Sequence, residues 1–157
     1  MIIIWIDPWT TTVWYAISEK IWKTISLLDY GIIKTIPKIE NCIKLLEIWQ
    51  DINNLIKKFT PDLACIEKLY FTNNIKTWIN VSEARGVILY EFMKSNIKIQ
   101  EYTPLEVKKY ITWNWTANKK QVQNAIKIFF KLQETPKPDD VADAIAISYL
   151  WALSIKN

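Results

Sequence analysis

Four carboxylates stand at places in this sequence where a catalytic site could be assembled. Asp7 and Glu67 each follow a run of apolar residues that reads as a buried strand. Acids at the ends of neighbouring central strands would project at one edge of a sheet. Asp140 and Asp143 are three residues apart in the first turns of a predicted helix, which places them on one face, whereas the adjacent Asp139 points elsewhere.

The chemistry that these residue types allow is narrow. The sequence has no histidine, and its two cysteines, Cys42 and Cys65, lack metal-ligand spacing, so a Ser/His/Asp triad and a histidine-ligated zinc site are excluded. Converging carboxylates alone make an oxygen-only site, which suits Mg²⁺ or Mn²⁺. Two such ions about 3.5–4 Å apart cleave phosphodiesters by activating a water and stabilising the leaving oxygen.

Each acid also has a simpler interpretation when it is taken alone. Asp7 precedes Pro8 and could start a turn. Glu67 could be a surface acid paired with Lys68, and the acids near residue 140 could stabilise a helix dipole. The order of all four along the chain favours the metal site.

The elements that must position these acids are strands and helices, which are distinguished by the spacing of their apolar residues. Strands are predicted over 2–6, 11–18, 24–34, 63–66 and 97–102, and helices over 39–59, 74–95, 104–111, 119–133 and 138–154. The first three strands read as an antiparallel meander, and the later strands alternate with helices. We therefore predict one α/β domain over 1–157, a five-stranded mixed sheet flanked by helices.

Bulk properties set further limits. Charged residues interrupt every apolar run, so no membrane span is predicted, and the first residues lack the basic region of a signal peptide. With so few cysteines, which we expect to be reduced and buried, a cytoplasmic protein is expected. The net charge of +4 is compatible with a nucleic-acid partner.

The balance of glycine and tryptophan is abnormal. The chain has nine tryptophans and two glycines, and together they make 11 of 157 residues, which is the ordinary glycine share of about 7%. We therefore hypothesise that the gene uses the opal codon for glycine and that it was translated as tryptophan. The alternative is a tryptophan-rich aromatic core.

Five motifs in order along nearly the whole chain give the sequence a specific resemblance. They are "IDPWTTTVWYAI", "DLACIEKLYF", "VSEARGVILYE", "YTPLEVKKYITWNWTANKKQVQ" and "PKPDDVADAIAIS". The chain resembles the RuvC family of crossover-junction endodeoxyribonucleases. The resemblance implies a ribonuclease H-like fold, a homodimer that cuts Holliday junctions with Mg²⁺, and catalytic metal-binding roles for Asp7, Glu67, Asp140 and Asp143. Some members have histidine at one of the last-helix positions, where this chain has acids.

The resemblance also implies DNA contacts. Tyr70 matches an aromatic residue that stacks on bases near the crossover, and Lys108 and Lys119 match phosphate-contacting lysines. Hydrophobic packing is the alternative for Tyr70, and we expect it for the neighbouring Phe71. Arg85, the single arginine, lies on the helix that packs at the family's dimer interface, and no catalytic role is assigned to it.

The family has glycine where this chain has five of its tryptophans: Trp5, Trp9, Trp14, Trp113 and Trp115. A turn beside a metal site requires close approach or a positive φ, which glycine adopts freely. Three further tryptophans, at 22, 78 and 151, are also plausible glycines, whereas Trp49 is ambiguous. We predict that Trp9 crowds Asp7 in the chain as written.

The expected function is therefore Mg²⁺-dependent resolution of four-way junctions, with two ions in each site and Mn²⁺ as a substitute. A branch-migration motor is a further partner suggested by analogy alone. Two alternatives remain open: another ribonuclease H-like nuclease that acts on hybrids or flaps, and a junction-binding protein without catalysis.

Overall fold

The computed structural model describes residues 1–9, 12–22, 24–36, 38–68 and 75–103, together with residues 106, 120, 121, 124, 127 and 128. Seven elements lie in these ranges. They are β1 (Ile2–Pro8), β2 (Thr12–Ile21), β3 (Thr24–Lys34), α1 (Asn41–Phe59), β4 (Leu63–Glu67), α2 (Ile75–Lys94) and β5 (Lys98–Tyr102).

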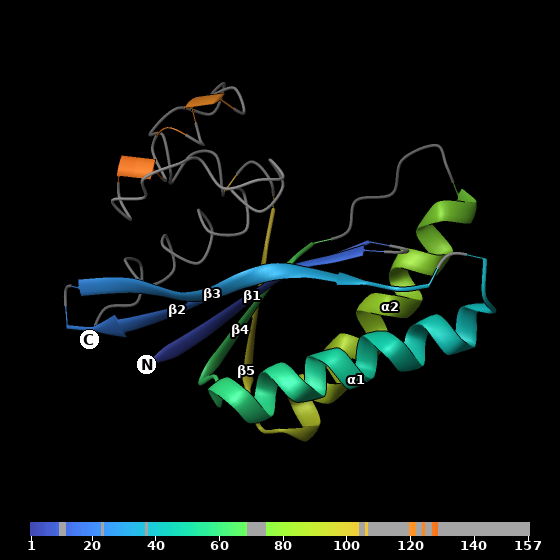
Figure 1. Cartoon of the computed structure of the whole chain (residues 1–157), viewed down its shortest axis with the longest axis horizontal. Coiled ribbons are helices and arrows are strands. Elements are labelled where there is room, and N and C mark those ends of the chain that lie inside the picture. The colour runs from blue at the N-terminus through green and yellow to red at the C-terminus, as the bar shows by residue number, and fades with distance from the viewer. Residues whose placement is uncertain are drawn as a thin grey trace.

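The five strands form one mixed sheet in the order β3-β2-β1-β4-β5 (Figure 1). β1, β2 and β3 are an antiparallel meander, whereas β1 pairs with β4 and β4 with β5 in parallel. The parallel strands require crossovers, and α1 and α2 supply them. The predicted five-stranded mixed sheet is confirmed, and β1 and β4 lie at its centre.

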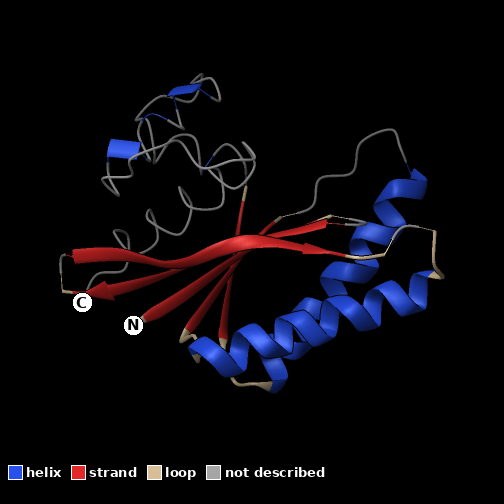
Figure 2. Cartoon of the chain, in the orientation of Figure 1, coloured by secondary structure: helices blue, strands red, loops and turns tan. Residues whose placement is uncertain are grey.

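Both crossover helices cover the same face of the sheet (Figure 2). Alternate residues of the central strands point into this core, namely Ile4 and Ile6 from β1 and Ala64 and Ile66 from β4. They pack with buried residues of the helices, among them Ile48, Ile52, Ile88 and Phe92. The period of two along a strand therefore divides each central strand into a helix-covered face and an opposite face.

α1 shows where sequence periodicity was insufficient. Helical spacing predicts one apolar stripe of Ile43, Leu46, Ile52 and Ile56. Ile52 is fully buried and Ile56 packs against the core, as predicted, but Ile43 and Leu46 are 45% and 51% exposed, and Ile48, which was not in the stripe, is fully buried. The helix ends as expected, with Lys57 and Lys58 in its last turn and Thr60 in a left-handed cap whose N–H donates to the Ile56 carbonyl at 2.8 Å.

Strand bounds differ from expectation mainly in β2. It was expected to end at Ser18 but continues to Ile21, with a register shift between Ile17 and Ser18. The polar residues that suggested a turn are paired instead with β3, and the chain reverses at Trp22. The predicted β3, over 24–34, matches the observed strand.

The burial of the cysteines, the absence of a membrane span and the later helices were also predicted. Cys65 is buried, and burial raises the pKa of its thiol, but Cys42 is exposed, so the expectation of two buried thiols was wrong. None of the helices in the described ranges has the length and apolar composition of a membrane span. Residue 106 is helical, as are the described residues 120, 121, 124, 127 and 128, in agreement with the helices predicted there.

Candidate metal centre and its surroundings

Asp7 and Glu67 lie at the same edge of the sheet. The parallel register of β1 and β4 runs from Ile3 opposite Leu63 to Ile6 opposite Ile66, and one further step matches Asp7 with Glu67. Both acids are partly exposed. They therefore stand side by side at the carboxyl ends of the two central strands, where open α/β sheets place their ligands.

The pleat sends both acids to the same face. Ile6 and Ile66 point into the core beneath α1 and α2, so the residues that follow them project from the opposite face. Two carboxylates on one face are an oxygen-donor set that fits Mg²⁺ or Mn²⁺. Within the described residues no third acid, cysteine or histidine joins them to complete a cluster.

Five of the predicted site residues lie outside the residues that the structure describes. They are Asp140, Asp143, Tyr70, Lys108 and Lys119. The structure thus brings Asp7 and Glu67 together, and the functional roles of all seven residues stay predictions.

The backbone around Glu67 is held by groups that the sequence did not reveal. The Lys68 N–H donates to the Tyr102 carbonyl of β5 at 2.6 Å. From α2, the Arg85 Nε–H donates to the Glu67 carbonyl at 3.4 Å, and the Arg85 guanidinium forms an ion pair with Glu101. Burial lowers the pKa of Arg85 from its usual value. The sequence indicated a special role for this residue only in that Arg85 is the single arginine.

A capping box begins the helix predicted to carry Lys108. The Glu106 N–H donates to the Thr103 hydroxyl at 3.1 Å, and the Glu106 carboxylate accepts from the Thr103 N–H at 2.8 Å. Hydrogen bonds to the Glu106 carboxylate from the Thr103 backbone N–H and from the Thr103 side chain, with a smaller contribution from Lys68, hold the pKa of Glu106 below its usual value. The helix thus begins directly after β5, close to the end of β4.

The tryptophans beside Asp7 occupy two different environments. Trp5 lies two residues before Asp7 on the same strand, is 1% exposed, and its indole N–H has no hydrogen-bond partner among the described residues. Trp9 is 47% exposed, and its ring meets that of Trp78 edge-on with the centroids 6.3 Å apart. Crowding of Asp7 by Trp9 stays a prediction.

Trp22 has the backbone of a glycine position. Its φ is 56°, in the left-handed region, and its side chain is 82% exposed at the reversal between β2 and β3. Because the indole is mostly exposed, its burial stabilises the fold little. The backbone conformation, in contrast, favours a residue without a Cβ. This position supports the hypothesis that tryptophan stands for glycine.

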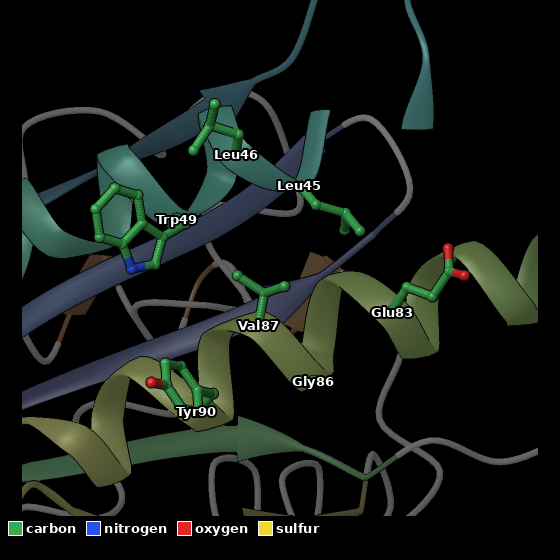
Figure 3. Close-up of a pocket in the computed structure, with 7 residues that line it drawn as sticks. All are labelled: Leu45, Leu46, Trp49, Glu83, Gly86, Val87 and Tyr90. Atoms are coloured by element: carbon green, nitrogen blue, oxygen red, sulfur yellow. The ribbon is translucent and has the colours of Figure 1, made fainter. Parts of the chain in front are cut away.

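A groove of about 720 Å³ lies between α1 and α2 (Figure 3), and neither Asp7 nor Glu67 lines it. Its walls are mainly apolar, with Leu46 and Trp49 on α1 and Val87 and Tyr90 on α2. Leu46 and Tyr90 are 51% and 64% exposed. The groove is therefore distinct from the edge that bears Asp7 and Glu67.

Comparison with known proteins agrees with this geometry. The family model described as "Crossover junction endodeoxyribonuclease RuvC" matches residues 3–150. Proteins with that name from Halothermothrix orenii and Petrotoga mobilis are 46% and 44% identical, over 94% and 95% of this chain and 90% and 91% of their own.

Solved structures give the same fold. A Thermus thermophilus RuvC in complex with Holliday junction substrate superposes with a TM-score of 0.88 at 24% identity, covering 96% of this chain and 92% of its own. The fowlpox virus Holliday junction resolvase superposes with a TM-score of 0.63 at 17% identity, covering 99% and 100%. The predicted ribonuclease H-like fold is confirmed. The chain belongs to the RuvC family of crossover junction endodeoxyribonucleases.

Proposed function

We propose that this chain is a metal-dependent, structure-selective DNA endonuclease that resolves four-way junctions by paired symmetric nicks. The observation that carries the proposal is the placement of Asp7 and Glu67 side by side, on one face, at the carboxyl ends of the two central strands of a RuvC-family chain. A single nuclease domain over 1–157 and a cytoplasmic location, where the DNA substrate lies, belong to the same proposal.

Nucleases of this family are metal-dependent, and Mg²⁺, with Mn²⁺ as a substitute, is the ion that we propose here. Asp7, Glu67, Asp140 and Asp143 would hold two ions, which when bound activate a water and stabilise the leaving oxygen. The role of the chain is to hold four ionised carboxylates in place and to present the scissile phosphate to them. Hydrolysis would leave a 5′-phosphate and a 3′-hydroxyl.

Binding of the junction is assigned to residues beyond the acids. Tyr70 follows Glu67 by three residues, and stacking of a base on its ring would contribute about 1–3 kcal/mol. Lys108 and Lys119 would contact phosphates, and the capping box of Thr103 and Glu106 supports this for Lys108 by beginning its predicted helix beside β4. These contacts would make binding depend on salt concentration.

A homodimer would present two such sites to opposing strands. The groove between α1 and α2 supports this proposal, because it offers the exposed apolar side chains of Leu46 and Tyr90 on a face that bears neither Asp7 nor Glu67. We assign a second copy of the chain as its occupant. Contact with a branch-migration motor is proposed by analogy alone.

The test compares substrates in Mg²⁺, using the chain as printed and a form with glycine at all nine tryptophan positions. A labelled four-way junction is offered beside its linear duplex and an RNA–DNA hybrid. The proposal expects nicking of the junction in preference to both, with loss of nicking in Asp143→Asn. Cleavage of the hybrid in preference would favour another ribonuclease H-like nuclease. Tight junction binding without nicking in either form would favour a binding protein.

A further inference from the structure

Arg85 lies behind the proposed metal site. It lies on α2, one turn before the fully buried Ile88, and its side chain is 16% exposed. Its guanidinium reaches two groups on two strands: Nε–H donates to the Glu67 carbonyl of β4 at 3.4 Å, and the same group is ion-paired with Glu101 of β5. Arg85 thus joins α2 to the ends of both strands.

The contact falls where the pairing of β1 with β4 stops, while the pairing of β4 with β5 still includes Glu67. The pairing of β1 with β4 ends at Ile6 opposite Ile66, one residue short of the acids. On the β5 side, the Lys68 N–H still donates to the Tyr102 carbonyl at 2.6 Å. The backbone of Glu67 is therefore held by β5 from one direction and by Arg85 from α2.

The guanidinium and the side chain of Glu67 lie on opposite faces of the sheet. Glu101 pairs with Ile66 across the strands and shares its helix-covered face, whereas the pleat sends the Glu67 side chain to the opposite face. Arg85 consequently meets the carbonyl of Glu67 rather than its carboxylate. Its positive charge is balanced by Glu101, which reduces repulsion of a cation bound on the far side.

We propose that Arg85 is a positioning residue that fixes the Glu67 backbone and thereby keeps the Glu67 carboxylate in place for metal binding. This inference rests on the proposed function of the acids. The guanidinium is suited to the task because its fork can donate to a carbonyl and a carboxylate at once, whereas a lysine amine is a single point donor. Outer-shell partners of this kind change metal affinity by about 10–100-fold.

The test measures Mn²⁺ binding by electron paramagnetic resonance titration of the full chain without DNA. It uses whichever form, with tryptophan or with glycine at the nine positions, nicks the junction. The variants are Arg85→Gln and Arg85→Lys. The control is Lys58→Gln, which removes one positive charge from the exposed pair of Lys58 and Asp29. Thermal unfolding of each variant is followed alongside.

The positioning role predicts that Arg85→Gln and Arg85→Lys both weaken Mn²⁺ binding, by about tenfold for Arg85→Gln, while Lys58→Gln binds as the wild type. A pure charge effect has the opposite sign, because loss of a nearby cation tightens Mn²⁺ binding in Arg85→Gln and leaves Arg85→Lys unchanged. A purely structural role lowers the melting temperature of both without changing Mn²⁺ affinity. Either of these results overturns the inference. Should Arg85→Gln fail to fold, Arg85→Lys decides alone.

Failure of the inference is distinguishable from failure of the proposed function. If neither form of the unsubstituted chain nicks a junction, the proposed function fails. If the unsubstituted chain nicks the junction and both variants bind Mn²⁺ as it does, the inference about Arg85 fails alone.

Discussion

The indole N–H of Trp49 on α1 donates a 2.7 Å hydrogen bond to the carboxylate of Glu91 on α2. Glu91 is 4% exposed, and the Lys94 amine lies 3.5 Å from the same oxygen. A buried carboxylate requires such partners, because an oxygen that accepts no hydrogen bond has lost its water without replacement, and this destabilises the fold. The pair therefore ties the two crossover helices together.

Trp49→Phe is expected to lower the free energy of unfolding by about 1–3 kcal/mol, because it removes the N–H and leaves the aromatic ring. The measurement is urea unfolding at pH 7. Trp22→Phe is the matched control, since that side chain is 82% exposed, and it should leave stability unchanged. Equal effects at the two positions would show that the Trp49–Glu91 bond does not stabilise the fold.

Trp22→Gly is expected to stabilise the chain by about 1 kcal/mol, since φ at this position is 56° and a Cβ is disfavoured there. Trp22→Ala separates backbone from side chain, because it removes the indole and keeps the Cβ. If alanine stabilised as much as glycine, the backbone explanation would be wrong. Sequencing the nine codons tests the wider hypothesis: uniform opal codons support it and ordinary tryptophan codons contradict it.

The capping box predicts a dependence of stability on pH. The folded-state pKa of Glu106 is held below its usual value of 4.5, so its contribution is present above that value and is lost as the pH falls through the folded pKa. Glu106→Gln should therefore destabilise the chain at pH 7 and lose this effect in stronger acid.

Thr103→Ala removes the hydroxyl of the same capping box and keeps the Thr103 backbone N–H. It should cost about 1 kcal/mol at pH 7, as the loss of a helix cap typically does. In that background the pH-dependent effect of Glu106→Gln should shrink. An undiminished effect would mean that the Thr103 hydroxyl contributes nothing to the pH dependence, because the Thr103 N–H still donates to the Glu106 carboxylate in this variant.

Dimerisation through the groove predicts that Tyr90→Lys shifts the chain from dimer to monomer in sedimentation velocity, because a buried charge would replace an aromatic contact. Tyr30→Lys on β3 is the control, as Tyr30 is also exposed but lies on another part of the surface. If the Tyr90→Lys variant remained a dimer at micromolar concentration, the dimer interface would lie elsewhere on the chain.

The strands and the two central acids were predictable because each depends on local pattern. Apolar runs ending at Asp7 and Glu67 identified both acids, and the parallel pairing of β1 with β4 then follows from strands that alternate with helices. β2 was misjudged at its end, where Glu19 and Lys20 read as a turn although pairing with β3 keeps them extended.

Features that depend on packing could not be read from the sequence. α1 carries apolar residues on more than one side, and only its contact with α2 and the sheet decides that Ile48 is buried while Ile43 and Leu46 are exposed. Arg85 reaches Glu67 across 18 positions of sequence, a relation that no local periodicity contains. The exposure of Cys42 at the start of α1 is likewise a result of where the helix lies.

The most direct test of the central claim is nicking of a synthetic four-way junction in Mg²⁺ by Asp7→Asn and Glu67→Gln. Asp62→Asn is the matched control, because Asp62 accepts the Ile2 N–H at the opposite end of β1 and β4. We expect paired symmetric nicks from the unsubstituted chain and from the control. Asp7→Asn and Glu67→Gln should each lower the rate by at least about 100-fold while still binding the junction in chelator. Nicking that survives both substitutions would contradict the central claim.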